Sequence, residues 1–120
     1  MITDYFSLKG KRALITGAGK GIGARIATAF AEMGADVALV ARTQSDLDAV
    51  ADEVRVLGRD EHTFACDVTD EAALTGVVQT LTEAWGSLDI LINDAGAPGQ
   101  GYGSLKKVTK ARFENTIDIN

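Results

Sequence analysis

The sequence has a single cysteine, a single proline and only 6% aromatic residues. With one cysteine, Cys66, no disulfide can form within the chain, and a reducing cytoplasm fits this composition. We interpret the Cys66 thiol as a small buried hydrophobe and not as a nucleophile. The chain has no apolar stretch long enough to span a bilayer, and Asp4 stands where a signal peptide would be basic. We therefore expect a cytoplasmic protein that does not associate with membranes.

Positive charge is also scarce. The 120 residues carry 12 Lys and Arg against 17 Asp and Glu, a net charge of −5, without a dense basic run. Nucleic acid is therefore not an expected partner, since nothing would neutralise its phosphates. His62 has no second ligand in view, so no metal site is predicted. The composition, 46% hydrophobic and 24% charged, is that of one globular domain over residues 1–120.

Apolar runs alternate with segments of helical apolar spacing four times along the chain, which predicts β-α units and a parallel sheet. The expected strands are residues 12–16, 36–41, about 62–66, and 88–92. Right-handed crossovers then predict the strand order 3-2-1-4. The predicted fold class is α/β, a Rossmann-like parallel sheet with flanking helices.

Helix boundaries follow from local residue chemistry. Ile22 is expected to open the apolar face of the first helix, Ser45 to cap the second, and Asp70 to cap the third. Glycines just after each of these helices are expected to end them. A last helix is expected from about Thr109 to Asn120.

The most informative stretch is the glycine-rich turn between the first strand and the first helix, at residues 16–23. Glycines there let the backbone turn sharply and approach a bulky anion, which a Cβ would obstruct. The helix that follows directs unpaired N–H groups and its positive dipole end to the same place. A strand, such a turn and a helix in this order predict a diphosphate-binding site. Its expected residues are Gly17, Lys20, Gly21, Ile22 and Gly23.

Arg42 and Thr43 follow the second strand, where a dinucleotide fold often has an acid that binds the ribose 2′-hydroxyl. An arginine at this position accommodates a 2′-phosphate instead, and the Thr43 hydroxyl and the Lys20 ammonium add to the site. These residues predict NADP(H) in preference to NAD(H). The alternative is that Arg42 is a solvated surface residue of an NAD(H)-preferring protein.

The ends of the third and fourth strands carry further candidates. Asp67 and Val68 follow the third strand at the edge where open α/β sheets bind ligands, so Asp67 can accept a hydrogen bond from adenine N6. Asn93 can tie neighbouring strands together, and the small Ala95 and Gly96 permit close backbone contact with a ribose. The alternative interpretation is that both segments are plain turns.

In combination, the Thr16-Gly-x-x-x-Gly-x-Gly23 turn, the Asp67-Val68 pair and the Asn93-x-Ala-Gly96 turn resemble the short-chain dehydrogenase/reductase family. The resemblance covers nearly the whole chain. It implies a compact, NADP-type oxidoreductase that transfers a hydride between the nicotinamide and the carbon of a small-molecule carbonyl or alcohol. It also implies that Asn120 is the active-site asparagine, which helps to hold a water molecule in a proton relay.

Two departures from the family pattern qualify this resemblance. Asp94 stands where the family commonly has asparagine, which removes amide donors and adds a charge. The catalytic Ser and the Tyr-x-x-x-Lys pair of the family lie downstream of the position that matches Asn120. Tyr102 and Lys106 fit Tyr-x-x-x-Lys literally, but they lie in a glycine-rich stretch that is a poor helix, so we interpret the match as coincidence.

The resemblance thus implies the truncated, cofactor-binding half of a doubly wound fold, which we expect to be inactive as a 120-residue polypeptide. The complete enzyme is expected to be a homo-oligomer. The alternative function is a non-catalytic dinucleotide-binding or sensor module, which would use the same residues and would need neither Tyr nor Lys.

Overall fold

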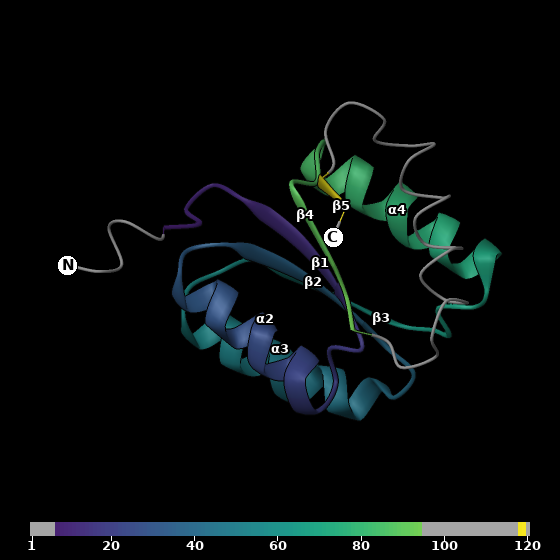
Figure 1. The fold of residues 1–120 in the computed structure, drawn as a ribbon, viewed down its shortest axis with the longest axis horizontal. Helices are drawn as coiled ribbons and strands as arrows, with labels where there is room; N and C mark the ends of the chain where they lie inside the picture. The colour runs from purple at the N-terminus through teal and green to yellow at the C-terminus, as the bar shows by residue number, and fades with distance from the viewer. Residues whose placement is uncertain (1–6, 95–117, 120) are drawn as a thin grey trace.

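A computed structural model describes residues 7–94 and 118–119. These residues form a parallel β-sheet with helices on both of its faces (Figure 1). The strands are β1 (Arg12–Thr16), β2 (Asp36–Ala41), β3 (Glu61–Ala65), β4 (Ile90–Asn93) and β5 (Asp118–Ile119). The helices are α2 (Gly21–Glu32), α3 (Gln44–Val56) and α4 (Glu71–Trp85).

The strand order is β3-β2-β1-β4-β5, which confirms the predicted order 3-2-1-4 and adds β5 beyond β4. All four strand pairings are parallel. In the register of the sheet, Thr16 at the end of β1 lies beside Val40 of β2 and Asn93 of β4. The carboxyl ends of the strands therefore meet at one edge of the sheet, where the residues that follow them come together.

The core consists of two layers, one on each face of the sheet. Ala13 and Ile15 of β1 pack with residues of α2 and α3, whereas Leu14 packs with residues of α4. Figure 1 shows the same arrangement, with α2 and α3 on one face and α4 on the other. Successive side chains of a strand point to opposite faces, so β1 contributes to both layers and is buried on both sides.

The predicted ends of α4 are confirmed. The Asp70 side chain accepts a hydrogen bond of 3.1 Å from the backbone N–H of Ala73, as expected for an N-cap. Gly86 ends the helix in the left-handed conformation, with φ at 76°. A residue without a Cβ adopts this conformation at little cost.

Two expectations for the other helices are wrong. Ser45 does not cap α3, because that helix begins one residue earlier, at Gln44, and its N-cap is Thr43. Ile22 does not open the apolar face of α2, since its side chain is 71% exposed. The buried face of α2 contains small residues instead, including Ala27 and Ala31, which lie against the core shared with α3.

The helix expected up to Asn120 is wrong at residues 118–119, which form β5. This short strand pairs in parallel with Ile90 and Leu91 of β4. The edge of β4 offers backbone N–H and C=O groups that a neighbouring strand can satisfy, and the β-branched Ile119 suits a strand. The remainder of the expected helix, including Asn120, lies outside the described residues.

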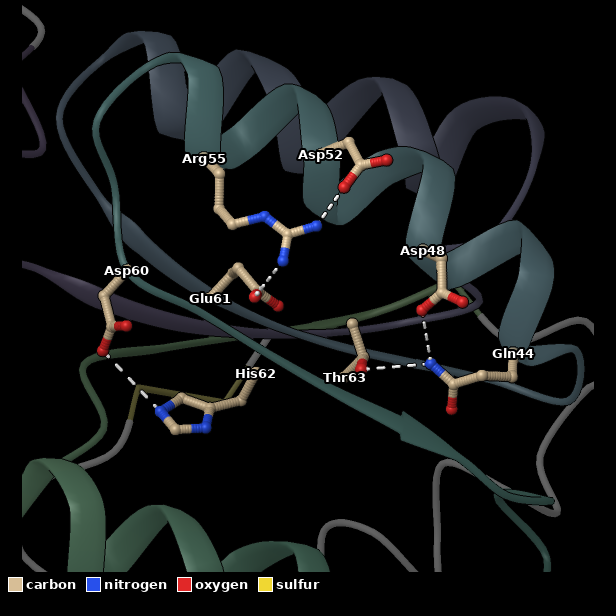
Figure 2. Close-up of polar contacts among 8 residues, drawn as sticks. All are labelled: Gln44, Asp48, Asp52, Arg55, Asp60, Glu61, His62 and Thr63. Atoms are coloured by element: carbon tan, nitrogen blue, oxygen red, sulfur yellow. Dashed lines mark hydrogen bonds and ion pairs between the residues drawn. The ribbon is translucent and has the colours of Figure 1, made fainter.

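Side chains of α3 contact β3, one of the two edge strands of the described sheet (Figure 2). Gln44 Nε2 donates to Thr63 Oγ1 at 3.2 Å and to Asp48 Oδ1 at 2.8 Å. Arg55 Nη1 lies 3.4 Å from Glu61 Oε1. These contacts hold α3 against the strand whose carboxyl end leads into Asp67.

Candidate functional site

A hollow of about 490 Å³ lies at the carboxyl edge of the sheet, beside the ends of β1, β2 and β3. It is lined by residues from the turn after β1, the segment from the end of β2 into α3, and the turn after β3. These residues are Gly17, Gly19, Lys20, Ala41, Arg42, Thr43, Asp46, Cys66, Asp67, Val68 and Thr69.

The glycines of the turn after β1 have specific structural roles. Gly17 and Gly21 have positive φ angles of 67° and 57°, which side chains strongly disfavour. A Cβ on Gly23 would lie 2.0 Å from the carbonyl oxygen of Gly17 and 3.0 Å from Asp94 Oδ2. Only glycine at position 23 therefore allows the start of α2 to close onto the turn.

The N terminus of α2 has no side-chain cap. Its N-cap residue, Lys20, makes no capping hydrogen bond, and the first turn of the helix has no acidic residue. Asp70 caps α4, whereas α3, like α2, has no side-chain cap; of these two, α2 is the helix that follows the glycine-rich turn. The first amides of α2 and the positive end of its dipole are therefore available to an anion, and the absence of a Cβ at Gly21 and Gly23 gives it room.

Two ion pairs join residues that line the hollow. Lys20 Nζ lies 3.6 Å from Asp46 Oδ2, and Arg42 Nη2 lies 3.5 Å from Asp67 Oδ2. The cations are highly exposed, at 82% for Lys20 and 78% for Arg42. Such pairs are worth little, because water competes for both partners, so a ligand with more negative charge can displace them.

Asp67 is held by its own turn. The backbone N–H and the hydroxyl of Thr69 donate to Asp67 Oδ1 at 2.9 and 2.8 Å. These two hydrogen bonds, with a smaller contribution from the charge of Arg42, lower the pKa of the Asp67 carboxyl below its ordinary value. Oδ2 contacts Arg42 and has further capacity to accept a hydrogen bond.

Cys66 and Val68 form the apolar part of the lining, and both pack against the core layer under α4. Burial raises the pKa of the Cys66 thiol, and the charges of Asp70 and Asp67 raise it further. The thiol therefore stays protonated near neutral pH, which agrees with its interpretation as a packing residue. It is only partly buried, however, and it lines the hollow.

Asn93 ties β4 to β1, as its position suggested. The Thr16 hydroxyl donates a hydrogen bond of 2.7 Å to Asn93 Oδ1. The backbone N–H of Asp94 donates to the Thr16 carbonyl at 3.3 Å. The end of β4 therefore lies directly beside the start of the glycine-rich turn.

The predicted site residues fall into three groups. Gly17, Lys20, Arg42, Thr43, Asp67 and Val68 line the hollow together. Gly21, Ile22 and Gly23 are at the start of α2, and Asn93 ends the neighbouring strand. The other candidates, Ala95, Gly96 and Asn120, lie outside the described residues, as do Tyr102 and Lys106.

Gly19, Ala41, Asp46, Cys66 and Thr69 line the hollow without having been predicted to do so. Asp46 could have been found from its position in the first turn of the second helix, because that helix begins at the same edge of the sheet.

Within residues 7–94 and 118–119, no group of His, Cys, Asp or Glu side chains is arranged to hold a metal ion. No helix in these ranges has both the length and the apolarity needed to cross a membrane.

A family model described as short chain dehydrogenase matches residues 11–120. The chain belongs to this family. The expected resemblance is thereby confirmed, and the parallel sheet with its glycine-rich turn agrees with it.

Proteins with related sequences occur in Mycobacterium tuberculosis and Emericella nidulans. An uncharacterized oxidoreductase of Mycobacterium tuberculosis is 47% identical over 96 residues, which are 80% of this chain and 36% of that protein. Versicolorin reductase of Emericella nidulans is 37% identical over 119 residues, which are 98% of this chain and 44% of that protein. The chain thus spans less than half of the length of either relative.

The solved structure of a dehydrogenase shows the same fold. This structure, 7α-hydroxysteroid dehydrogenase complexed with NADH and 7-oxo glycochenodeoxycholic acid, superimposes with a TM-score of 0.86 at 29% identity. The match covers 98% of this chain and 55% of that one.

Proposed function

We propose that this chain is the NADP(H)-binding part of a short-chain oxidoreductase that interconverts a small carbonyl compound and an alcohol by hydride transfer. Membership of the family supports the oxidoreductase class. The names of the curated relatives, a reductase and an oxidoreductase, favour an enzyme over a non-catalytic sensor module. The observation that carries the proposal is the uncapped N terminus of α2 closed tightly onto the glycine-rich turn.

The diphosphate is assigned to the start of α2. Gly17, Gly21 and Gly23 shape the turn so that no Cβ stands between the backbone and the ligand, and the amides at Gly21 and Ile22 begin the helix. Lys20 adds a positive charge at the same end.

The 2′-phosphate is assigned to Arg42, Thr43 and Lys20. The Arg42 guanidinium has a fork of donors that suits phosphate, and its exposed pairing with Asp67 is weak enough to be displaced. Thr43, the residue after Arg42, is also exposed.

The adenosine is assigned to the turns after β3 and β4. Asp67 Oδ2 accepts from adenine N6, and Val68 provides apolar contact. Asn93, Ala95 and Gly96 are assigned to the ribose side. The hollow of about 490 Å³ has the size of a nucleotide subsite.

NAD(H) is a second candidate cofactor, and two observations favour it. Both cations of the hollow are already paired with carboxylates, so the site is less positive than Lys20 and Arg42 alone suggest. The related 7α-hydroxysteroid dehydrogenase was solved with NADH.

The remaining roles are proposed from the family resemblance. The bound nicotinamide supplies the hydride chemistry, and Asn120 helps to hold the water of a proton relay. Residues 1–120 alone are proposed to lack turnover. The complete enzyme is proposed to be a cytoplasmic homo-oligomer.

Calorimetric titration of the protein with NADPH and NADH tests the cofactor assignment. We expect Arg42→Ala to weaken NADPH binding by about ten- to a hundredfold, because the 2′-phosphate loses a charged hydrogen-bond donor. NADH has no 2′-phosphate, so its binding should be nearly unchanged. Arg25→Ala is the control, because Arg25 is an exposed residue of α2 that does not line the hollow. An unchanged ratio of the two affinities in Arg42→Ala would reject the assignment.

A further inference from the structure

We propose that Asp46 is a specificity-determining residue, which lowers the preference of this site for a 2′-phosphorylated nucleotide by neutralising Lys20. The inference rests on the proposed function and deepens it. Asp46 is in the first turn of α3 and has no role in the assignments above.

Asp46 is held at the glycine-rich turn. A Cβ on Gly19 would lie 3.0 Å from the Cβ of Asp46, so the helix and the turn are in direct contact at this point. The Asp46 side chain is 28% exposed, whereas that of Lys20 is 82% exposed. The carboxylate is therefore the fixed partner of the ion pair, and the long lysine side chain is the partner that moves.

The charges of the hollow are balanced. Its lining contains Lys20 and Arg42, and opposite them the carboxylates Asp46 and Asp67. A 2′-phosphate brings close to two negative charges and requires cations that are free to turn toward it. To do so, Lys20 must give up its ion pair with Asp46. A nucleotide without the 2′-phosphate does not draw Lys20 away and meets no such cost.

Asp46 is better suited than Asp67 to this role. Asp67 accepts two hydrogen bonds from Thr69 and is assigned to adenine, so its loss would change the binding of every adenine nucleotide. Asp46, by contrast, pairs with Lys20 and packs against Gly19. Its charge can therefore change discrimination without changing the adenine subsite.

The test compares Asp46→Asn with the wild type by calorimetric titration, with 2′,5′-ADP and 5′-AMP as probes. We expect Asp46→Asn to bind 2′,5′-ADP about two- to fivefold more tightly, because Lys20 no longer has to leave an exposed ion pair. The affinity for 5′-AMP should be unchanged. Asp48→Asn is the matched control: it lies on the same helix, contacts Gln44 (Figure 2) and does not line the hollow. We expect it to change neither affinity.

A second background tests whether Lys20 transmits the effect. In Lys20→Met, the substitution Asp46→Asn should no longer improve the binding of 2′,5′-ADP. The inference is overturned if Asp46→Asn weakens or does not change 2′,5′-ADP binding, if it changes 5′-AMP binding equally, or if its gain persists in Lys20→Met. Failure of the wild type to bind either probe would instead reject the proposed function, and this inference with it.

Discussion

Thr16 and Asn93 are 77 positions apart in the sequence, and the Thr16 hydroxyl donates a 2.7 Å hydrogen bond to Asn93 Oδ1. Thr16 is fully buried, and the two residues lie side by side in the register of β1 and β4. Each is the last residue of its strand. The bond therefore ties the end of β4 to the end of β1, where the glycine-rich turn begins.

Replacing Thr16 with valine should reduce the free energy of unfolding by about 1 kcal/mol, because the side-chain shape is kept while Asn93 loses its donor. Thr28→Val is the control. Thr28 is buried in α2, and its hydroxyl bonds to backbone carbonyls of its own helix, at 3.1 and 3.4 Å. We expect Thr28→Val to change the free energy of unfolding by no more than about 0.5 kcal/mol. Urea denaturation measures both, and equal losses would contradict a specific role for the Thr16–Asn93 bond.

Gly23→Ala should destabilise the protein by about 1–3 kcal/mol and abolish nucleotide binding, because the added methyl would overlap the Gly17 carbonyl. Gly76→Ala is the matched substitution in the middle of α4, where a Cβ meets no atom within 4 Å. It should stabilise the protein by up to about 1 kcal/mol through helix propensity. Thermal unfolding and nucleotide titration of both variants check this prediction, which fails if Gly23→Ala still binds nucleotide like the wild type.

The stability contribution of the Asp67 charge should depend on pH. Because hydrogen bonds from Thr69 hold the folded-state pKa of this carboxyl below its unfolded value, the contribution is complete above the unfolded pKa and disappears as the pH falls through the folded pKa. The difference in unfolding free energy between the wild type and Asp67→Asn should be constant above about pH 5 and shrink below about pH 4. If this free-energy difference grew on acidification, folding would raise the pKa of Asp67 instead of lowering it, and the prediction would be wrong.

Cys66 should react slowly with iodoacetamide near neutral pH, because burial raises the pKa of its thiol and thiolate is the reactive form. The unfolded chain in urea is the reference, and it should react faster. Since Cys66 lines the hollow, saturating NADP should slow the reaction of the folded protein further. Mass spectrometry follows the modification. Equal rates with and without nucleotide would place the ligand elsewhere.

The parts of the fold that depend on local chemistry were predictable from the sequence. Helix α4 begins after Asp70 and ends at Gly86, as expected, because a cap and a left-handed glycine act within one turn of the chain. The strand order also followed, since the handedness of the crossovers leaves few alternatives.

The parts that depend on tertiary contacts were not predictable in this way. Residues 118–119 form a strand because the edge of β4 is beside them, and helical spacing carries no sign of that edge. The pairing of Lys20 with Asp46 joins the starts of two helices separated by a strand. Residue type favours Ser45 as a cap, although α3 begins at Gln44, directly after Thr43.

The most direct test is a crystal structure of the protein soaked with NADP. We predict that the diphosphate lies against the first amides of α2 beside Gly17 and Gly21, and that the Arg42 guanidinium has left Asp67 to contact the 2′-phosphate. A nucleotide bound elsewhere, or bound here with Arg42 still on Asp67 and the 2′-phosphate directed into solvent, would contradict this prediction.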